Sequence, residues 1–132
     1  MILVDTSVWI DFFNGTDTPH RAALHRVIDE EEDLALTGIV LTEVLQGFKH
    51  DDDMVKAKER LRALVFFHPE FPADYLAAAT LYRACRKKGV TIRKTVDCLI
   101  AQIALKHGLR LLHRDADFDA IAGVHPLKTF AP

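Results

Sequence analysis

Four carboxylates stand where an ordinary structural role explains their positions poorly. Asp5 directly follows a short apolar run, and Asp115 follows another after His113 and Arg114, as residues at or just beyond the end of a buried strand would. Asp97 lies at the start of an amphipathic segment, and Glu43 lies inside an otherwise apolar one. If these acids meet in one partly buried cleft, they must be protonated or neutralised by a cation, because like charges at close range strongly raise each other's pKa.

The ligand types favour a hard divalent cation. Carboxylate oxygens with no Cys or His among them favour Mg²⁺ or Mn²⁺ over zinc, and none of the seven histidines has zinc-ligand spacing. Such an ion can lower the pKa of a bound water and stabilise an in-line phosphoryl transition state. The residues therefore predict a metal-dependent phosphodiesterase. Thr6 and Ser7, directly after Asp5, could bond to a carboxylate or a metal-bound water, or cap the next helix.

Each acid also has a structural explanation when it is taken alone. Asp97 could complement a helix dipole, Asp115 could cap a turn, and Asp5 could bond to backbone amides after its strand. Glu43 could be a partly exposed helix residue. The catalytic interpretation therefore depends on convergence, which requires that the strands end at a common edge of one sheet.

The spacing of apolar residues predicts such a sheet. Short apolar runs that alternate with helical spacing imply right-handed crossovers and a mainly parallel sheet covered on both faces. Four strands are expected at 2–4, 34–36, 64–67 and 109–113, and an edge strand at 127–130 would make a fifth. Helices are expected at about 8–13, from 19 into the acidic run 30–33, and at 39–48, 54–64, 73–88 and 95–107. The expected architecture is a single three-layer α/β/α domain over residues 1–132.

Composition sets limits on partners and location. The 132 residues are 49% hydrophobic and 27% charged, which is typical of one folded globular domain. The net charge of −2 means that a nucleic-acid partner would need a local basic patch. Cys85 and Cys98 are expected as buried thiols in a reducing compartment. The sequence has no signal-peptide pattern and no apolar stretch of membrane-spanning length, so we expect a cytoplasmic protein with no membrane partner.

Four segments carry a resemblance to a known family. They are Ile2–Trp9, Leu41–Gly47, Ile92–Ala101 and Leu112–Phe118, and together they span almost the whole chain. In order and spacing they resemble the PIN-domain ribonucleases, and specifically the VapC-type toxins of bacterial toxin–antitoxin systems. Any one segment is a weak signal, but the ordered set is specific.

The resemblance implies an endoribonuclease that needs Mg²⁺ or Mn²⁺ and cleaves structured RNA, such as transfer or ribosomal RNA. It implies an acidic catalytic quartet of Asp5, Glu43, Asp97 and Asp115. It implies metal ligation by Asp5, Asp97, Asp115 and Asp117, and it leaves open which of Asp115 and Asp117 lies closer to the ion. Asp119 is expected to be a surface residue. The resemblance also implies a homodimer and a small VapB-type antitoxin whose C-terminal tail occupies the cleft.

Three basic residues near the acids are candidates for contact with the RNA backbone. Arg93, four residues before Asp97, is the preferred one, and Lys94 and Arg114 are further candidates. The run 86–88 is also basic, but a solvated helix end explains it better.

Two other classes of function are open at this point. A catalytically inactive PIN-like domain could serve as a dimerisation or binding module, although a pure scaffold has no use for uncompensated carboxylates. A metal-dependent phosphohydrolase with an aspartyl nucleophile would want a second acid two residues after Asp5, where the chain has Ser7. A nucleotide-binding switch is disfavoured because the chain has no phosphate-binding glycine loop.

Overall fold

The computed structural model describes residues 1–132 and has four short strands in one parallel sheet. The strands are β1 (Ile2–Val4), β2 (Leu34–Thr37), β3 (Val65–Phe67) and β4 (Arg110–Leu112). Their order across the sheet is β3-β2-β1-β4, so the chain steps outward from β1 to β3 and then returns to the other side of β1. The strand order therefore reverses between β1 and β4, which is where open parallel sheets form a ligand crevice.

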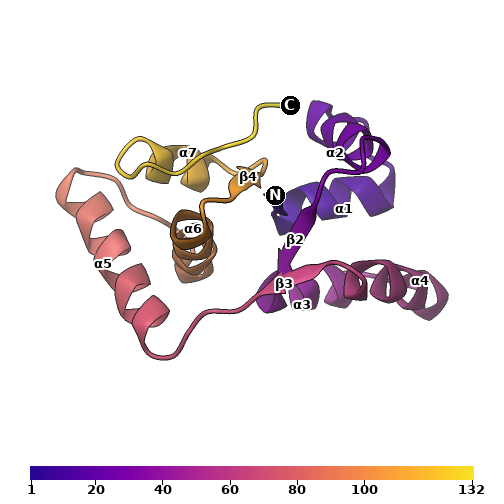
Figure 1. Cartoon of the computed structure of the whole chain (residues 1–132), viewed down its shortest axis with the longest axis horizontal. Coiled ribbons are helices and arrows are strands. Elements are labelled where there is room, and N and C mark those ends of the chain that lie inside the picture. The colour runs from indigo at the N-terminus through magenta and orange to yellow at the C-terminus, as the bar shows by residue number, and fades with distance from the viewer.

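Seven helices cover the two faces of this sheet (Figure 1). They are α1 (Thr6–Asn14), α2 (Pro19–Asp29), α3 (Gly38–Gln46), α4 (Asp51–Arg62), α5 (Ala73–Lys87), α6 (Thr95–His107) and α7 (Ala116–Ala122). In Figure 1, α5, α6 and α7 lie to the left of the sheet, and α1, α2 and α4 lie to its right. The predicted three-layer α/β/α class is confirmed.

Local signals in the sequence determine where the helices begin and end. Asp5, Thr37 and Asp115 each cap the helix that follows a strand, because a side-chain oxygen accepts a backbone N–H from the first turn. Gly15 and Gly108 follow α1 and α6 in the left-handed conformation that ends many helices. Three strands therefore lead into capped helices at one edge of the sheet.

The core lies on both faces of the central strand. Ile2, Leu3 and Val4 are fully buried, as expected for a strand that is paired on both sides and covered on both faces. Cys85 and Cys98 are buried free thiols within helices, which agrees with their predicted role as small apolar residues. None of the helices combines the length and the apolar character that a bilayer span requires.

The structure differs from the sequence-based expectations mainly near the C-terminus. Helix α7 was not predicted. It has only seven residues, and only two of its large apolar side chains, Phe118 and Ile121, are fully buried, so the apolar spacing is too short to indicate a helix. The suggested edge strand at 127–130 is reduced to a single parallel bridge between Leu111 and Thr129. Helix α4 runs from Asp51 to Arg62, so the acidic run 51–53, which suits a helix start, forms its first turn, and the helix ends two residues before the expected 64.

Candidate active site

A cleft of about 370 Å³ opens at the carboxyl ends of β1 and β4. The backbone N–H of Asp5 donates to the carbonyl of Leu112 at 2.9 Å, which holds the ends of the two strands together. The cleft is lined by Asp5, Thr6, Ser7, Ile10, Glu43, Gln46, Lys94, Asp97, Arg114 and Asp115. All four acids of the predicted quartet therefore line one cleft, together with Ile10 and Gln46, which sequence reasoning did not single out.

Three acids approach one another most closely. Asp97, Asp115 and Asp117 each offer a carboxylate oxygen, and these oxygens all lie within 4.8 Å of one another. Asp97 comes from the first turn of α6, whereas Asp115 caps α7 and Asp117 lies in its first turn. Asp97 and Asp117 are buried. Three carboxylates at this spacing, two of them out of water, form a site that a cation would stabilise.

The electrostatics of Asp97 support this assignment. Burial, followed by the charges of Asp115 and Asp5, raises the pKa of Asp97 to about 7. Its Oδ2 atom is buried and has no hydrogen-bond partner in the protein. A buried carboxylate oxygen without a partner is costly unless a proton or a metal ion compensates it. These residues therefore fit the hard divalent cation that the sequence predicts.

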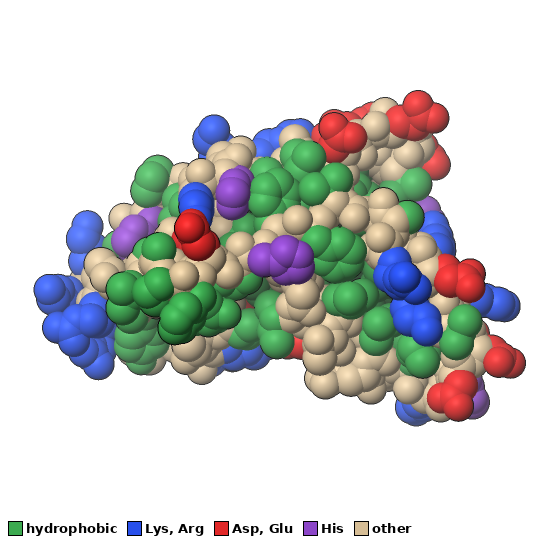
Figure 2. All heavy atoms as spheres, turned by 60° about the horizontal axis from the view of Figure 1, so that its bottom comes forward, with side chains coloured by type: hydrophobic (Ala, Val, Ile, Leu, Met, Phe, Trp, Pro, Cys, Tyr) green, Lys and Arg blue, Asp and Glu red, His purple; other side chains and the backbone are tan.

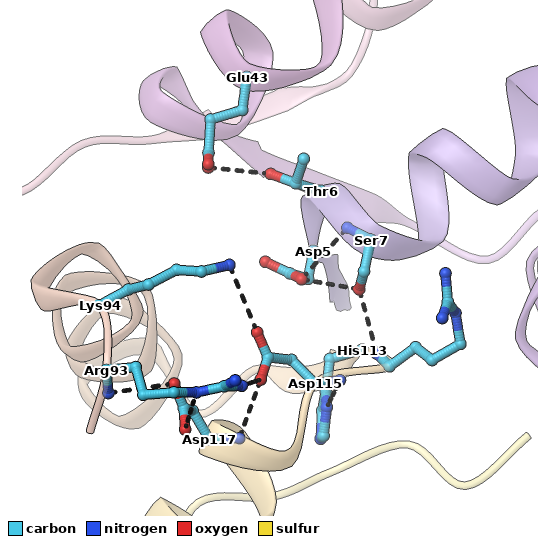
Figure 3. A network of polar contacts seen from close by, with 10 residues as sticks. Asp5, Thr6, Ser7, Glu43, Arg93, Lys94, His113, Asp115 and Asp117 are labelled. Atoms are coloured by element: carbon cyan, nitrogen blue, oxygen red, sulfur yellow. Dashed lines mark hydrogen bonds and ion pairs between the residues drawn. The ribbon is translucent and has the colours of Figure 1, made fainter. Parts of the chain in front are cut away.

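Asp5 is held in place by Ser7 (Figure 3). The Oδ2 atom of Asp5 accepts the Ser7 hydroxyl at 2.8 Å and the Ser7 backbone N–H at 3.3 Å. The same hydroxyl oxygen accepts the backbone N–H of Arg114 at 3.1 Å. Ser7 thus links the end of β1 to the loop after β4, and it fixes the orientation of one carboxylate in the cleft.

Glu43 stands on the opposite wall of the cleft from the three clustered acids. It projects from α3, and its Oε1 atom accepts the hydroxyl of Thr6 at 3.0 Å. Figure 3 shows this pair across the cleft from Asp115 and Asp117, with Asp5 between them. The space between the walls is therefore bordered by acids on both sides.

The loop after β4 is fixed by His113. The Nδ1 atom of His113 accepts the backbone N–H of Asp115 at 3.1 Å, which requires that this nitrogen carry no proton. Burial lowers the pKa of His113 and so favours the neutral ring. Asp119, the expected surface residue, has a side chain that is 74% exposed and lies 3.6 Å from His113.

Two of the predicted RNA-binding residues contact the acids directly. The guanidinium of Arg93 lies 3.4 Å from Asp117 and 3.5 Å from Asp115, and Lys94 Nζ lies 3.8 Å from Asp115. The backbone N–H of Arg93 also donates to Asp117 at 3.2 Å. Both side chains are more than half exposed and make long contacts, so they offset part of the negative charge without being fixed.

The third predicted RNA-binding residue, Arg114, is held differently. Its Nε and Nη2 atoms donate to the two carboxylate oxygens of Asp11 at 2.8 and 2.9 Å. Asp11 is a buried acid of α1 that sequence reasoning missed. The only signal was its place in a largely apolar helix, six residues after Asp5.

Comparison with known proteins places this site in a family. Residues 2–124 match the PIN domain family. The chain is 37% identical over 129 residues to ribonuclease VapC11 of Mycobacterium tuberculosis, and this alignment covers 97% of the chain and 96% of the relative. The chain therefore belongs to the PIN-domain family and, within it, to the VapC ribonucleases.

Solved structures share the fold at lower sequence identity. VapBC2 from Rickettsia felis, solved bound to a DNA fragment from its promoter, gives a TM-score of 0.76 at 18% identity and covers 98% of both chains. The sarcin-ricin-loop-cleaving toxin VapC20 of Mycobacterium tuberculosis gives 0.70 at 22% identity, covering 97% of this chain and 99% of its own. At these identities the likeness extends to the fold alone.

Proposed function

We propose that this protein is a metal-dependent endoribonuclease that acts as the toxin of a type II toxin–antitoxin pair. The observation that carries the proposal is the cluster of Asp97, Asp115 and Asp117, with an unpartnered buried oxygen on Asp97, in a VapC-family chain. The phosphohydrolase alternative is weaker, because position 7 supplies a hydroxyl bonded to Asp5 and not a second acid. Residues 1–132 would act as one domain.

The acids divide into two roles. Asp5, Asp97, Asp115 and Asp117 would hold Mg²⁺ or Mn²⁺. When bound, the ion would supply a water of lowered pKa and offset charge that develops on the phosphate. Asp115 and Asp117 would both contribute, since each belongs to the close cluster. Glu43 would accept a proton from the attacking water at Oε2, because its Oε1 atom is engaged by Thr6.

The substrate would be a structured RNA, either transfer or ribosomal. Arg93, Lys94 and Arg114 surround the acids and would contact phosphates, which makes binding dependent on salt. The sarcin-ricin loop, which the structural neighbour VapC20 cleaves, is one RNA to include in the test. The protein would work in the cytoplasm.

Two protein partners follow from membership of the family. A VapB-type antitoxin would inhibit the enzyme by laying its C-terminal tail in the acidic cleft. A second copy of the chain would form a homodimer. Three exposed apolar side chains, Phe71 just before α5 and Tyr75 and Leu76 in its first turn, support a protein interface on this surface.

Cleavage of bulk transfer and ribosomal RNA by antitoxin-free protein tests the proposal. The assay would contain Mg²⁺, Mn²⁺ or EDTA, and it would compare wild type with Asp5→Asn, which keeps the shape of the side chain but removes its charge. We expect cleavage only with metal and none by the variant. Asp52→Asn, which removes an exposed acid of α4, is the matched control and should cleave normally.

Three results would contradict the proposal. Cleavage that persists in Asp5→Asn would mean that the site is wrong or that a contaminant is active. Cleavage in EDTA would exclude the metal-dependent mechanism. A folded, metal-binding wild type that cuts neither RNA class would favour the inactive binding module.

A further inference from the structure

An ion pair between the buried Asp11 and the half-exposed Arg114 lies beside the acidic cleft but outside the cluster of proposed metal ligands. Asp11, on α1, has a side chain that is 3% exposed, whereas that of Arg114 is 47% exposed. Both oxygens of Asp11 accept from the guanidinium, and its Oδ2 atom also accepts the hydroxyl of Thr18 at 3.0 Å. This carboxylate is therefore fully engaged, as a buried charge must be.

The pairing leaves part of the guanidinium free. Asp11 takes the Nε–H and one Nη2–H, so the two Nη1–H donors and the second Nη2–H have no protein partner. Arg114 lines the cleft together with Asp5 and Asp97. Its backbone N–H is bonded to Ser7, so both ends of the residue are fixed relative to the acids.

The ion pair with Asp11 also keeps Arg114 from pairing with the clustered acids. An arginine beside several acids tends to pair with them, as Arg93 does with Asp115 and Asp117 at 3.4 to 3.5 Å. Arg114 makes no such contact with the clustered acids, because Asp11 occupies the side of the guanidinium that forms the two-pronged bond. Its charge is thus kept beside the cleft without blocking the proposed metal ligands.

We propose that Asp11 is a positioning residue that holds Arg114 ready to bind a non-bridging phosphate oxygen of the RNA. The inference rests on the proposed function and deepens it. A planar, preorganised guanidinium loses little rotamer entropy when it binds phosphate. A fixed donor also stabilises charge at the reacting phosphate better than a mobile one does. Asp11 acts through Arg114 and does not itself touch the substrate.

The structure offers a matched control for the variant. Asp74, on α5, is also buried, and it accepts from Lys106, Gln102 and the backbone of Glu70. It lines no part of the acidic cleft. Asp74→Asn should therefore lower the melting temperature as Asp11→Asn does, without any effect on RNA.

Kinetics and binding test the proposal with Asp11→Asn, Arg114→Ala, their double variant, Arg114→Lys and Asp74→Asn. Cleavage of the bulk RNA in Mg²⁺ gives kcat and KM, below the melting temperature of each variant. Binding of a short labelled oligoribonucleotide in EDTA, followed by fluorescence anisotropy across a salt series, needs no catalysis. This second readout reports on Arg114 even if the wild type does not cleave, so failure of the proposed function is separable.

We expect three results. Asp11→Asn and Arg114→Lys each lower kcat/KM by roughly tenfold or more, the size of one charge-assisted hydrogen bond. Arg114→Ala lowers the slope of log affinity against log salt by about 0.7, one phosphate contact, whereas Asp11→Asn and Arg114→Lys keep the slope. The double variant is no worse than Arg114→Ala, because Asp11 acts only through Arg114.

Other results would overturn the inference. Wild-type kcat/KM in Asp11→Asn, with stability lowered as in Asp74→Asn, would mean that the pair only supports the fold. Losses that multiply in the double variant would give Asp11 a separate role. If Asp11→Asn fails to fold, Arg114→Lys decides, because wild-type kcat/KM in that variant would show that a fixed guanidinium is not needed.

Discussion

Asp97 carries an unfavourable charge in the metal-free protein. Its pKa is raised from 3.8 to about 7, first by burial and then by Asp115 and Asp5. Between these two pH values the folded protein binds more protons than the unfolded chain. The contribution of Asp97 to stability therefore falls as pH rises through this range, which is the reverse of the usual acid that forms an ion pair. A metal ion would remove this penalty.

Asp97→Asn should therefore stabilise the metal-free protein while it removes activity. In EDTA at pH 8 we expect a melting temperature several degrees above wild type, because 1 kcal/mol shifts a domain of this size by roughly 4 °C. The difference should shrink at pH 5, where Asp97 is protonated in the wild type. Mg²⁺ should raise the melting temperature of the wild type only. Thermal unfolding at both pH values measures this, and a variant less stable than wild type at pH 8 would contradict it.

For Asp5 and Asp115, the structural role and the proposed role in the active site are compatible. Asp5 accepts the backbone N–H of Ser7, and Asp115 accepts that of Asp117, so each caps a helix and also lines the cleft. These positions could be predicted because a strand end is visible in sequence. Asp11 could not, because its partner Arg114 is 103 residues away and nothing local marks an acid as buried.

At the scale of the element, two glycines should respond oppositely to alanine. Gly108 ends α6 with φ of +63°, where a Cβ atom is strained, so Gly108→Ala should cost about 1 kcal/mol. Gly38 begins α3, and a Cβ atom added there would meet no other heavy atom within 4 Å, so Gly38→Ala should gain roughly 0.4 to 1 kcal/mol. Urea unfolding measures both. A stabilised Gly108→Ala variant would contradict the role of this helix end.

The elements whose bounds were predicted best from sequence are those with a clear pattern of apolar residues and clear stops. The extended helices α5 and α6 and the buried strand β1 have clear periodicity and clear stops, and their expected bounds agree with the structure within about a residue. Helix α7 was missed because two turns give too short a pattern and its acids look like a loop. The edge strand expected at 127–130 was overestimated. Only Thr129 pairs there, with the distant Leu111, and the local sequence does not show how far such pairing extends.

At the scale of the molecule, the surface around α5 is the clearest candidate for self-association. Phe71 is 83% exposed and Leu76 is 65% exposed, which is unusual for side chains of this size. In Figure 2, hydrophobic side chains gather toward the left end of the molecule, the end at which α5 lies in Figure 1, beside a group of Lys and Arg. A surface of this kind is typical of a protein interface with an apolar centre and a charged rim.

Leu76→Asp should therefore convert the proposed homodimer into monomers. A buried, unpaired carboxylate at the interface would cost several kcal/mol, enough to shift association by orders of magnitude. Light scattering after size-exclusion chromatography measures the mass of each species. Val55→Asp, on an exposed position of α4, is the control and should remain dimeric. A dimeric Leu76→Asp variant would place the interface elsewhere.

The pairing of β1 with β4 has a consequence for when the active site can form during synthesis of the protein. Ser7 and Arg114, which share a hydrogen bond, are 107 residues apart, so the cleft cannot form until the chain has been made at least as far as Arg114 and β4 has paired with β1. A nascent chain that ends at α6 has Asp5, Glu43 and Asp97 but lacks β4 and Asp115. In such a chain one edge of β1 has no partner strand. Nuclease activity would then arise only after β4 and Asp115 have been made, so a shorter nascent chain would not cut RNA.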